Sequence, residues 1–222
     1  MTALTVIIPV LNAAPYLART LAALEGAPAL VVDGGSKDGT IELARAQGAG
    51  VVSAPRGRGV QLGAGARQAA SEWLLFLHAD TVLEAGWRCE ADTFMRCPDN
   101  LSRAAVFRFA LDDPSPHARR LERMVARRNR AFALPYGDQG LLIHRTLYDA
   151  LGGYRPLPIM EDVDIVRRLG RARLSNLTAR AITSAERWRR EGWRMRSARN
   201  LLCLALYFAA VPPRVIARVY GQ

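Results

Sequence analysis

Short apolar runs that alternate with helix-like segments are the sequence feature that most constrains the fold of this chain. Four such runs occur in the first 80 residues, and they read LTVIIPV, ALVVDG, GVVSA and WLLFLHAD. The segments that separate and follow them have helical spacing, and they cover 15–25, 40–47, 60–70 and 84–95. Continuous apolar strands separated by helices are typical of a parallel sheet. We therefore predict an α/β fold with a mostly parallel central sheet and helices on both of its faces.

The second half of the chain is less regular and ends in a basic helical segment. A further strand is expected at 104–111 and a basic helix at 117–132. Residues 186–200 combine two tryptophans with many arginines and lead into a final apolar helix. With 222 residues, half of them hydrophobic, the chain can bury one sizeable core. We predict a folded domain over 1–185 and an amphipathic helical tail over 186–222. Whether this tail packs on the domain or on a membrane surface stays open.

The charge of the chain is strongly positive and indicates an anionic partner. The formal net charge is +11 and the isoelectric point is near 10.7. Such a charge fits nucleic acid, an acidic membrane surface or a phosphorylated small molecule, and charge alone does not choose among them.

The cysteines and the apolar runs indicate a cellular location. Cys89, Cys97 and Cys203 are odd in number and form no CxxC pair, which predicts neither a disulfide framework nor a zinc site and fits a reducing cytosol. We expect no secretory signal, because the first strand follows Met1 without a basic leader. The apolar run 201–211 is short for a membrane span. We therefore expect a cytoplasmic protein, with peripheral attachment at the inner membrane face as an open alternative.

Acidic side chains follow the apolar runs at three places. Asp33 and Asp80 come directly after strands, and Glu161, Asp162 and Asp164 form a third cluster. Ligands of parallel sheets bind beyond the carboxyl ends of the strands. Three acidic groups at one sheet edge would form a negative pocket, which is costly unless it holds a cation or a hydrogen-bonding ligand.

Two glycine-rich loops add anion-binding potential. The loop DGGSKDGT offers tight turns and free backbone N–H groups, although an ordinary strand-to-helix turn has the same composition. The loop APRGRGVQLGAGA carries Arg56 and Arg58 but lacks the lysine of a P-loop and the spacing of a dinucleotide site. Its arginines, Arg58 above all, are candidates for bidentate contacts with a nucleotide diphosphate, with a solvated surface loop as the alternative.

Six segments, taken in order, resemble a single family. They read TVIIPVLN, VVDGGSKDGT, FLHADT, YGDQGLLIHR, GGY and MEDVDIVRRL. Their order resembles glycosyltransferase family 2 over roughly residues 5–169. The resemblance implies the GT-A fold of nucleotide-diphospho-sugar transferases and a reaction that inverts the configuration at the sugar. The HAD triplet and the GDQG element are further similar to small bacterial glycosyltransferases associated with radical-SAM/selenodomain proteins.

The resemblance implies a donor site and a metal site. It assigns nucleotide binding to Pro9, Asp33 and Asp80, and it makes Asp80 the ligand of Mg²⁺ or Mn²⁺ on the diphosphate. Hard divalent cations prefer oxygen ligands, so one carboxylate together with a diphosphate is chemically sufficient. His78 stands where the family usually has an acid, and it is open whether this histidine touches metal, binds phosphate or packs at the strand end.

The resemblance also implies the catalytic and acceptor-binding residues. The family's catalytic base maps to Asp162, which would deprotonate the acceptor hydroxyl. Glu161 beside it, with Asp138 and Gln139 of the GDQG element, are candidates for acceptor contacts. The segment SAERW is similar to an acceptor motif of processive synthases and adds Trp188 to that set.

The function that we expect is an inverting transfer of a sugar from a nucleotide sugar, commonly UDP-linked in this family, to an unidentified acceptor hydroxyl. One alternative is a nucleotidyltransferase on a related fold. The other is a basic module, without enzymatic activity, that binds nucleic acid or membrane; the acidic clusters argue against it. The expected partners are the donor, the acceptor and an anionic membrane surface. We expect no specific nucleic-acid binding, and the oligomeric state stays open.

Overall fold

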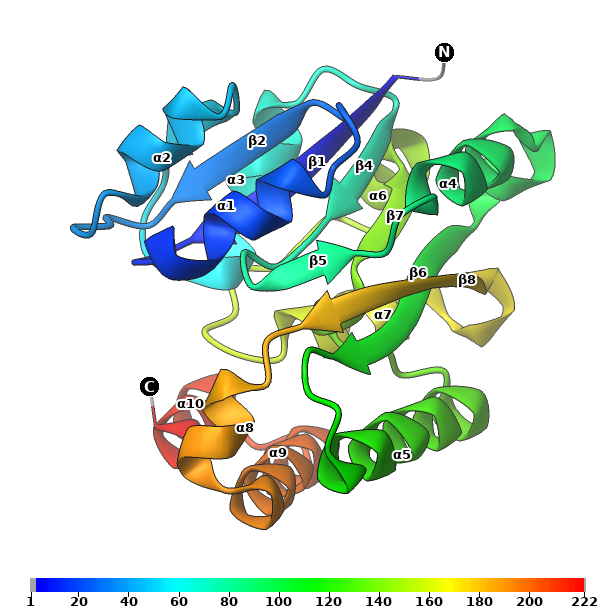
Figure 1. Cartoon of the computed structure of the whole chain (residues 1–222). Helices are drawn as coiled ribbons and strands as arrows, with labels where there is room; N and C mark the ends of the chain where they lie inside the picture. The colour runs from blue at the N-terminus through cyan, green and yellow to red at the C-terminus, as the bar shows by residue number, and fades with distance from the viewer. Residues whose placement is uncertain (1–2, 222) are drawn as a thin grey trace.

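The computed structural model describes residues 3–221 and contains, within that range, one eight-stranded mixed sheet with strand order β3-β2-β1-β4-β7-β6-β8-β5 (Figure 1). The four strands of the first half pair in parallel, as the sequence predicts. They are β1 (Leu4–Val10), β2 (Ala29–Asp33), β3 (Gly50–Ser53) and β4 (Trp73–Phe76). The helices that follow or separate them are α1 (Ala14–Ala22), α2 (Thr40–Ala46) and α3 (Arg58–Gln68).

The second half of the sheet adds the antiparallel pairings. Its strands are β5 (Thr81–Leu83), β6 (Ala104–Leu111), β7 (Leu141–His144) and β8 (Leu174–Thr183). β7 pairs antiparallel with both β4 and β6, β8 runs parallel to β6, and β5 closes the edge antiparallel to β8. Four of the seven pairings are therefore parallel. The strands β5, β7 and β8 are absent from the sequence-based expectation. β5 and β7 are only three and four residues long, and polar residues interrupt the apolar content of β8.

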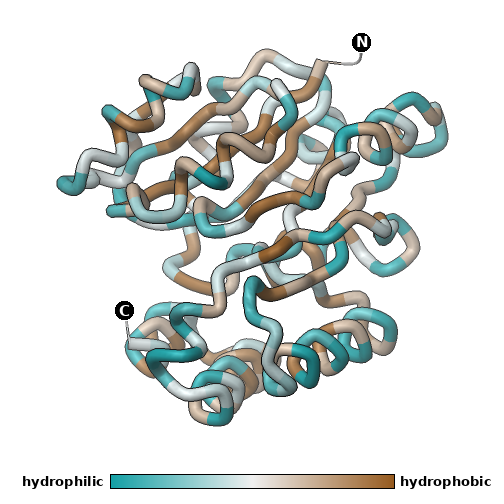
Figure 2. Tube along the Cα trace, viewed as in Figure 1, coloured by the Kyte–Doolittle hydropathy of each residue, from teal (hydrophilic) through white to brown (hydrophobic). Residues whose placement is uncertain are grey.

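Strand alternation divides the core between the two faces of the sheet. In β1, Val6 and Ile8 belong to one hydrophobic cluster, whereas Ile7 belongs to the other. In β4, Leu75 packs in the first cluster and Leu74 in the second. Successive strand residues point to opposite faces, so a fully buried strand reads as one continuous apolar run. Figure 2 shows the hydrophobic residues concentrated along these central strands.

The remaining helices cover the two faces of the sheet and connect its second half. They are α4 (Trp87–Arg96), α5 (Pro116–Phe132), α6 (Arg145–Ala150) and α7 (Glu161–Leu169), with short 3₁₀ turns η1 (Pro98–Ser102), η2 (Gly137–Gln139) and η3 (Arg171–Arg173). The close contact between α3 and its neighbours requires glycine. A Cβ on Gly65 would lie 2.4 Å from the Ile7 side chain, and one on Gly59 would lie 2.2 Å from the carbonyl oxygen of Arg155. Gly65 thus lets α3 lie close to β1, and Gly59 brings the start of α3 against the segment that leads into α7.

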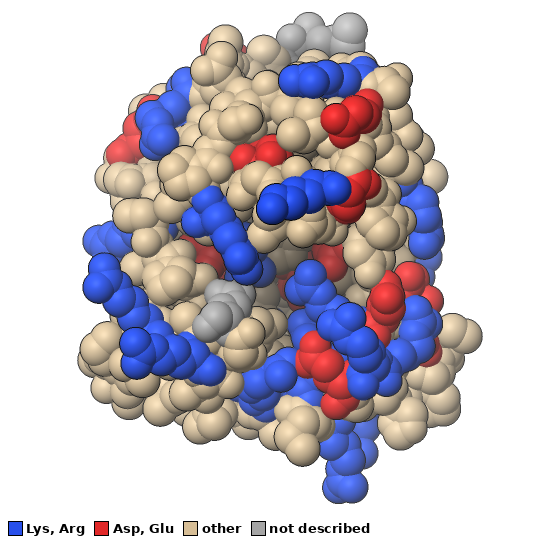
Figure 3. Space-filling view, turned by 90° about the vertical axis from the view of Figure 1, so that its left-hand side faces the viewer, with Lys and Arg blue, Asp and Glu red and all other residues tan. Residues whose placement is uncertain are grey.

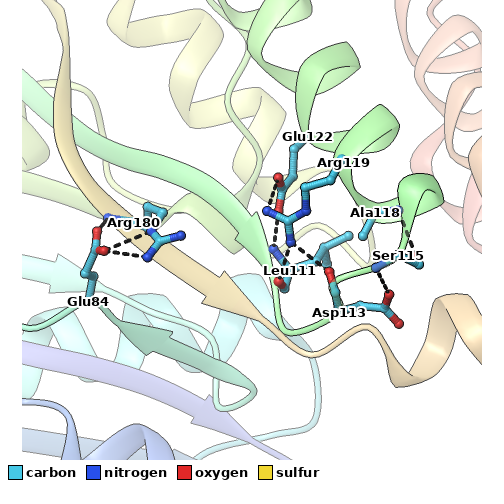
Figure 4. A network of polar contacts seen from close by, with 8 residues as sticks. All are labelled: Glu84, Leu111, Asp113, Ser115, Ala118, Arg119, Glu122 and Arg180. Atoms are coloured by element: carbon cyan, nitrogen blue, oxygen red, sulfur yellow. Dashed lines mark hydrogen bonds and ion pairs between the residues drawn. The ribbon is translucent and has the colours of Figure 1, made fainter.

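A polar network joins the start of α5 to the end of β6 (Figure 4). The Ser115 hydroxyl caps the helix by accepting from the Ala118 amide at 3.3 Å, and Asp113 accepts from the Ser115 amide at 2.8 Å. Glu122 of α5 accepts from the Leu111 amide at 2.8 Å. These bonds connect the first two turns of α5 to the end of β6 and so set the position of the helix.

The C-terminal segment forms three helices, α8 (Glu186–Glu191), α9 (Trp193–Phe208) and α10 (Pro213–Tyr220). Gly192, at φ 83°, separates α8 from α9, and Pro212 precedes α10. Figure 1 shows these helices together with α5 below the sheet, and we call these four elements the helical layer. The tail packs on the domain through two hydrophobic clusters. Trp188 and Trp193 pack against one that β6 and α5 form. The other contains Leu134, Ile159, Met160, Val163, Cys203, Leu204, Ile216 and Ala217. Within residues 3–221 no helix combines the length and apolar character that crossing a membrane requires.

Candidate active site

A cavity of about 120 Å³ lies between the sheet edge, the start of α7 and the helical layer. Its lining side chains come from the start of α3, the turn after β4, η2, the start of α7, the end of β8 and the tail. They include Arg58, His78, Asp80, Asp138, Asp162 and Trp188. Figure 3 shows a hollow on this side of the molecule, with acidic atoms inside and basic side chains around its rim.

The turn after β4 presents Asp80 to this cavity. The Ser184 amide donates to the Asp80 carbonyl oxygen at 3.0 Å, and the Thr20 hydroxyl donates to the Ala79 carbonyl oxygen at 2.7 Å. The Thr81 amide closes the turn on the His78 carbonyl oxygen at 3.2 Å. The backbone is thus fixed from both sides. Within residues 3–221 the carboxylate of Asp80 has no hydrogen-bond or ion-pair partner, so it is free to bind a ligand.

The His78 ring packs against the backbone of η2. A Cβ on Gly137 would lie only 2.7 Å from Nε2 of His78, so this position accommodates glycine alone without movement of the ring. Burial and the nearby Arg58 guanidinium lower the pKa of His78 to about 4. The ring is therefore neutral at neutral pH. A neutral imidazole can hydrogen-bond a phosphate through one N–H, and it adds no positive charge to the cavity.

Asp162 lies in the first turn of α7. Met160, at φ 65°, forms the tight entry into the helix. One carboxylate oxygen of Asp162 accepts from the Gly137 amide at 2.8 Å, and the other accepts from the Val163 amide at 2.8 Å. The bond to Gly137 spans 25 residues of sequence and sets the orientation of the carboxylate in the cavity.

Asp138, next to Gly137, is a half-buried acid in an unusual environment. Burial raises the pKa of Asp138 to about 7, the Arg128 guanidinium opposes this rise, and the carboxylates of Asp162 and Asp80 add to it. Its Oδ1 is buried without a hydrogen bond to any described residue. Because several carboxyl groups lie close together here, this part of the cavity favours binding of a proton, a cation or a hydrogen-bond donor of a ligand.

Of the three acids in MEDVD, Asp162 alone lines the cavity. Glu161 is 1% exposed and pairs with Arg58 at 2.6 Å from Nε to Oε1. Burial raises the pKa of Glu161, and Arg58 opposes that shift. Asp164 pairs with Arg168 of its own helix and with Arg155. Glu161 therefore positions Arg58, whose side chain lines the cavity, rather than facing it directly.

Asp33 and Pro9 lie at the same sheet edge but are not among the cavity-lining residues. Pro9 is buried in β1, and the Asp33 carboxylate accepts from the amides of Gly35 at 2.9 Å and Ser36 at 3.0 Å. The sequence predicts convergence of Asp33, Asp80 and Asp162 on one cavity. The structure brings Asp80 and Asp162 together and places Asp33 outside the lining, because the loop after β2 folds back onto its carboxylate.

Gln139 is also outside this cavity. Its Nε2 donates to the Phe107 carbonyl oxygen at 2.9 Å, and its Oε1 accepts from Asn129 at 2.7 Å. The side chain is 2% exposed and lies beside a separate groove between α5, β6 and β8. Its amide thus holds α5 to the sheet, whereas Asp138, one residue earlier, faces the cavity.

Comparison with known proteins identifies the family. A family model described as Glycosyl transferase family 2 matches residues 5–132, which is more than half of the chain. The chain belongs to glycosyl transferase family 2. It is accordingly a nucleotide-sugar glycosyltransferase, and the resemblance seen in the sequence is confirmed. A search of curated proteins found no match.

Solved structures with a similar fold are glycosyltransferases as well. The chain is similar to TarS residues 1–349 of S. aureus, with 16% identity and a TM-score of 0.63 over 100% of this chain and 70% of that one. It is similar to a mannosyltransferase of Pyrobaculum calidifontis, with 19% identity and a TM-score of 0.67 over 98% and 68%. Glucosyl-3-phosphoglycerate synthase of Mycobacterium tuberculosis gives 17% identity and a TM-score of 0.58 over 82% and 70%. These likenesses confirm the GT-A fold.

Sequence reasoning missed several residues of this family 2 site. Gln61 of α3 donates from Nε2 to the carbonyl oxygens of Val10 at 2.8 Å and Val32 at 2.7 Å, and so joins the ends of β1 and β2. From the tail, Arg187 and Arg196 line the cavity beside Trp188. The segment SAERW indicates an acceptor contact for Trp188, and nothing in its spacing indicates that Arg187 and α9 also reach the cavity.

The cavity fits a metal ion that a ligand shares with the protein. No group of three or more His, Cys, Asp or Glu side chains within residues 3–221 is arranged to hold a metal by itself. Asp80 and the unpaired Oδ1 of Asp138 do offer carboxylate oxygens in one cavity. Mg²⁺ and Mn²⁺ are commonly bound by one or two carboxylates, with the remaining positions filled by phosphate oxygens and water. The donor set thus suits a cation that arrives with a nucleotide diphosphate.

Proposed function

We propose that this protein is an inverting glycosyltransferase that transfers a sugar from a nucleotide sugar to an acceptor hydroxyl. UDP-linked sugars are the first donors to test. The observation that carries the proposal is the placement of Asp162, Asp80 and Arg58 around a single cavity. A fixed carboxylate for the acceptor, a free carboxylate for the diphosphate and a paired arginine are the groups that such a displacement needs.

The residues of the chain would act in one displacement step. Asp162 accepts the proton of the acceptor hydroxyl as its oxygen forms a bond to the anomeric carbon. The bond from that carbon to the diphosphate oxygen breaks, and the nucleoside diphosphate leaves with the electron pair. Attack from the face opposite the leaving group inverts the configuration. The hydrogen bond from Gly137 N–H to Asp162 Oδ2 orients the base. The other oxygen, Oδ1, accepts from Val163 N–H and would also accept the hydrogen bond of the acceptor hydroxyl.

The cavity wall offers positively charged hydrogen-bond donors to the leaving diphosphate. Arg58, held by Glu161 behind it, and Arg187 of the tail both line the cavity and can donate to phosphate oxygens. Asp80, with Asp138, would hold Mg²⁺ or Mn²⁺, which supplies neutralisation of the diphosphate charge when bound. The mannosyltransferase of P. calidifontis in complex with GDP-Man and Mn²⁺, and the M. tuberculosis synthase with Mn²⁺ and UDP, support this assignment.

The nucleoside and the acceptor would occupy different sides of the cavity. We assign the nucleoside to the loops after β1 and β2, where Pro9 and Asp33 lie and Gln61 joins the two strands. The acceptor would contact Asp138 and Trp188, which line the cavity near Asp162. Glu161 would act indirectly on the diphosphate side, through Arg58, and Gln139 on the acceptor side, through the position of η2.

A hydrolysis screen over nucleotide sugars tests this function without knowledge of the acceptor. The purified protein is incubated with UDP-, GDP-, ADP- and TDP-sugars with and without Mn²⁺, and release of nucleoside diphosphate is measured. We expect slow release from one donor class that Asp162→Asn reduces and EDTA suppresses. Absence of release and of binding for every nucleotide, together with salt-sensitive binding of duplex DNA, would contradict the proposal and favour a basic binding module.

A further inference from the structure

The net positive charge of the chain belongs entirely to the helical layer. Residues 116–132 and 186–220, which form the layer, contain 14 arginines and three acidic residues. The rest of the chain contains 17 basic and 17 acidic residues and is electrically neutral. The whole charge of +11 therefore lies on one side of the molecule. Lys and Arg side chains crowd the lower part of the face drawn in Figure 3. A one-sided field of this kind attracts an extended anionic partner.

Large apolar side chains are exposed on the same helices. Nine large hydrophobic residues are exposed among those that the structure describes, and eight of them lie on α5, α9 and α10. Phe132 and Met195 are each 70% exposed, and Leu201 is 67% exposed. Scattered exposed apolar residues are normal in soluble proteins, but a concentration on one group of neighbouring helices marks an interaction surface.

The pattern along α9 explains how one helix serves two surfaces. Cys203 and Leu204 are buried against the domain, whereas Leu201, Leu202 and Phe208 are exposed. Leu201 and Phe208 are seven positions apart and therefore share a face, which borders the buried face of Cys203 and Leu204 and extends toward Leu202. The inward stripe is accounted for by the hydrophobic cluster of the tail. Among the described residues, Arg167 of α7 lies over the Phe208 ring, 4.9 Å from its centroid, but half or more of Leu201 and Leu202 and about half of Phe208 stay exposed.

Helix α10 repeats this arrangement with arginines added. Ile216 and Ala217 are buried, and Val215 and Val219 are more than 40% exposed. Exposed arginines flank the outward apolar side chains of the layer, and they are Arg120, Arg127, Arg194, Arg214 and Arg218. None of the five forms an ion pair with another described residue. Apolar residues bordered by unpaired arginines are the composition of a surface that binds to a lipid headgroup region.

We propose that the outward face of the helical layer binds an anionic phospholipid surface. The exposed apolar side chains would enter the boundary between headgroups and acyl chains, and the arginines would contact the lipid phosphates. A nucleic acid would satisfy the arginines but would leave large aliphatic side chains such as Leu201 without a partner. A second copy of the chain would place two strongly positive faces against each other, which opposes association.

The attachment would use the faces of the helices that point away from the cavity. Arg187, Trp188 and Arg196 line the cavity from the inner side of α8 and α9. The outward stripes of α9 and α10 contain none of the residues that we assign to donor or acceptor. Binding of the lipid surface and binding of a nucleotide therefore depend on different side chains, and they can be measured and mutated separately.

Co-sedimentation with lipid vesicles tests the proposal. The full chain is mixed at moderate salt with vesicles of phosphatidylcholine alone, or of phosphatidylcholine with a minority of phosphatidylglycerol. We expect at least about tenfold tighter binding to the anionic vesicles, weakened by added salt. The double variant Leu201→Asp, Phe208→Asp should bind them at least about tenfold more weakly. Leu101→Asp, a change at the exposed apolar residue outside the layer, is the matched control and should bind as the unmodified chain does.

A charge variant keeps the test valid if the apolar variant folds poorly. Arg214→Glu with Arg218→Glu alters two exposed side chains of α10 and should also weaken vesicle binding at least about tenfold. Arg45→Glu with Arg67→Glu, which changes the net charge equally on the sheet half, should weaken it much less. Thermal unfolding checks that each variant is folded.

Four outcomes would overturn the proposal. The first is equal binding to neutral and anionic vesicles, and the second is equal loss of binding in the control variants. The third is an absence of vesicle binding combined with tight binding of duplex DNA, which would make the layer a nucleic-acid surface. The fourth is a dimer in light scattering that Leu201→Asp, Phe208→Asp dissociates without any vesicle binding, which would make the layer a contact between two copies.

Discussion

The two sides of the cavity differ in charge and in the way their side chains are held. On the sheet side, the backbone of Asp80 and the carboxylate of Asp162 are fixed by hydrogen bonds to backbone groups from distant segments. On the helical side, Arg187 and Trp188 come from the layer that holds the entire net charge of the chain. Rigid acids therefore face a strongly basic wall. Such a division suits a reaction in which a proton is removed on one side and a diphosphate charge develops beside the other.

The two sides of the cavity also differ in how much of the surrounding structure supports their side chains. The sheet side is part of a continuous hydrophobic core, so its acids are supported by strands that many other contacts stabilise. The helical side is joined to the domain through two smaller clusters and through polar bonds such as Ala185 N–H to Asp112 at 2.7 Å. We therefore expect substitutions on the sheet side to affect the chemical step, and substitutions on the helical side to affect binding of the acceptor.

The largest effect is expected from Asp162→Asn. The amide keeps the shape of the carboxylate and can still accept from Gly137 N–H, but it cannot take a proton. We expect the turnover number to fall about 10³-fold with donor affinity unchanged, measured by steady-state kinetics and nucleotide titration. Asp149→Asn, on the exposed face of α6, is the control and should be indistinguishable from the unmodified enzyme. Turnover that survives in Asp162→Asn would remove this residue as the base.

A smaller but still large effect is expected from Asp80→Ala. The carboxylate has no partner within residues 3–221, so its removal should leave the fold intact. We expect the gain in nucleotide affinity that Mn²⁺ confers, about 100-fold in the unmodified protein, to disappear. Calorimetric titration of UDP with and without Mn²⁺ measures this difference, and Asp99→Ala in the exposed turn η1 is the control. An unchanged Mn²⁺ effect would contradict the role of Asp80 in metal binding.

On the helical side, Trp188→Ala should affect the acceptor and spare the donor. Trp188 lines the cavity and stacks on Trp193, with ring centroids 5.9 Å apart, while Trp193 is not among the lining residues. Both truncations remove packing, so both should lower the unfolding temperature. We expect Trp188→Ala alone to reduce kcat/KM for the acceptor, about tenfold, without changing the KM of the donor. Equal kinetics in the two variants would mean that the tail merely supports the cavity.

The two sides of the cavity also differ in how far the sequence predicts them. Strands β1 and β4 are evident because burial on both faces leaves continuous apolar runs, and Asp80 ends the run that begins with β4. Strand β8 was missed because its residues alternate between half-buried and exposed positions and include arginine and asparagine. The path of the tail depends on the break at Gly192 and on contacts with Ile159 and Met160, which are remote in sequence. Local patterns carry no information about such contacts.

The same limit applies within the acidic segment MEDVD. Its three acids look equivalent in the sequence, and the helical period separates them in the structure. Asp162 faces the cavity, Glu161 turns toward Arg58, and Asp164 turns toward Arg168. The resemblance to the family selected Asp162 correctly as a cavity residue, but it could not show that Glu161 is a buried partner of Arg58. That assignment needs the position of α3 against the start of α7, which the absence of a Cβ at Gly59 permits.

The smallest effect concerns Asp138, which lies in η2 between the two sides of the cavity. Its pKa rises from an ordinary value of 3.8 to about 7 in the folded protein. Below pH 4 both the folded and the unfolded chain carry the proton, and the stabilising contribution is complete. As the pH rises from 4 to 7, the unfolded chain releases the proton more readily, so this contribution to stability is lost and does not return at higher pH.

Asp138→Asn keeps a neutral side chain at every pH. We therefore expect the free energy of unfolding of the variant, measured in urea, to increase relative to that of the unmodified protein as the pH rises across this window. His78, whose pKa is lowered to about 4, titrates in the opposite sense in the same window, but both proteins contain it and its effect cancels in the difference. A pH-independent difference would show that Asp138 is ionised in the fold, and the cavity would then hold more negative charge against its basic wall than we infer.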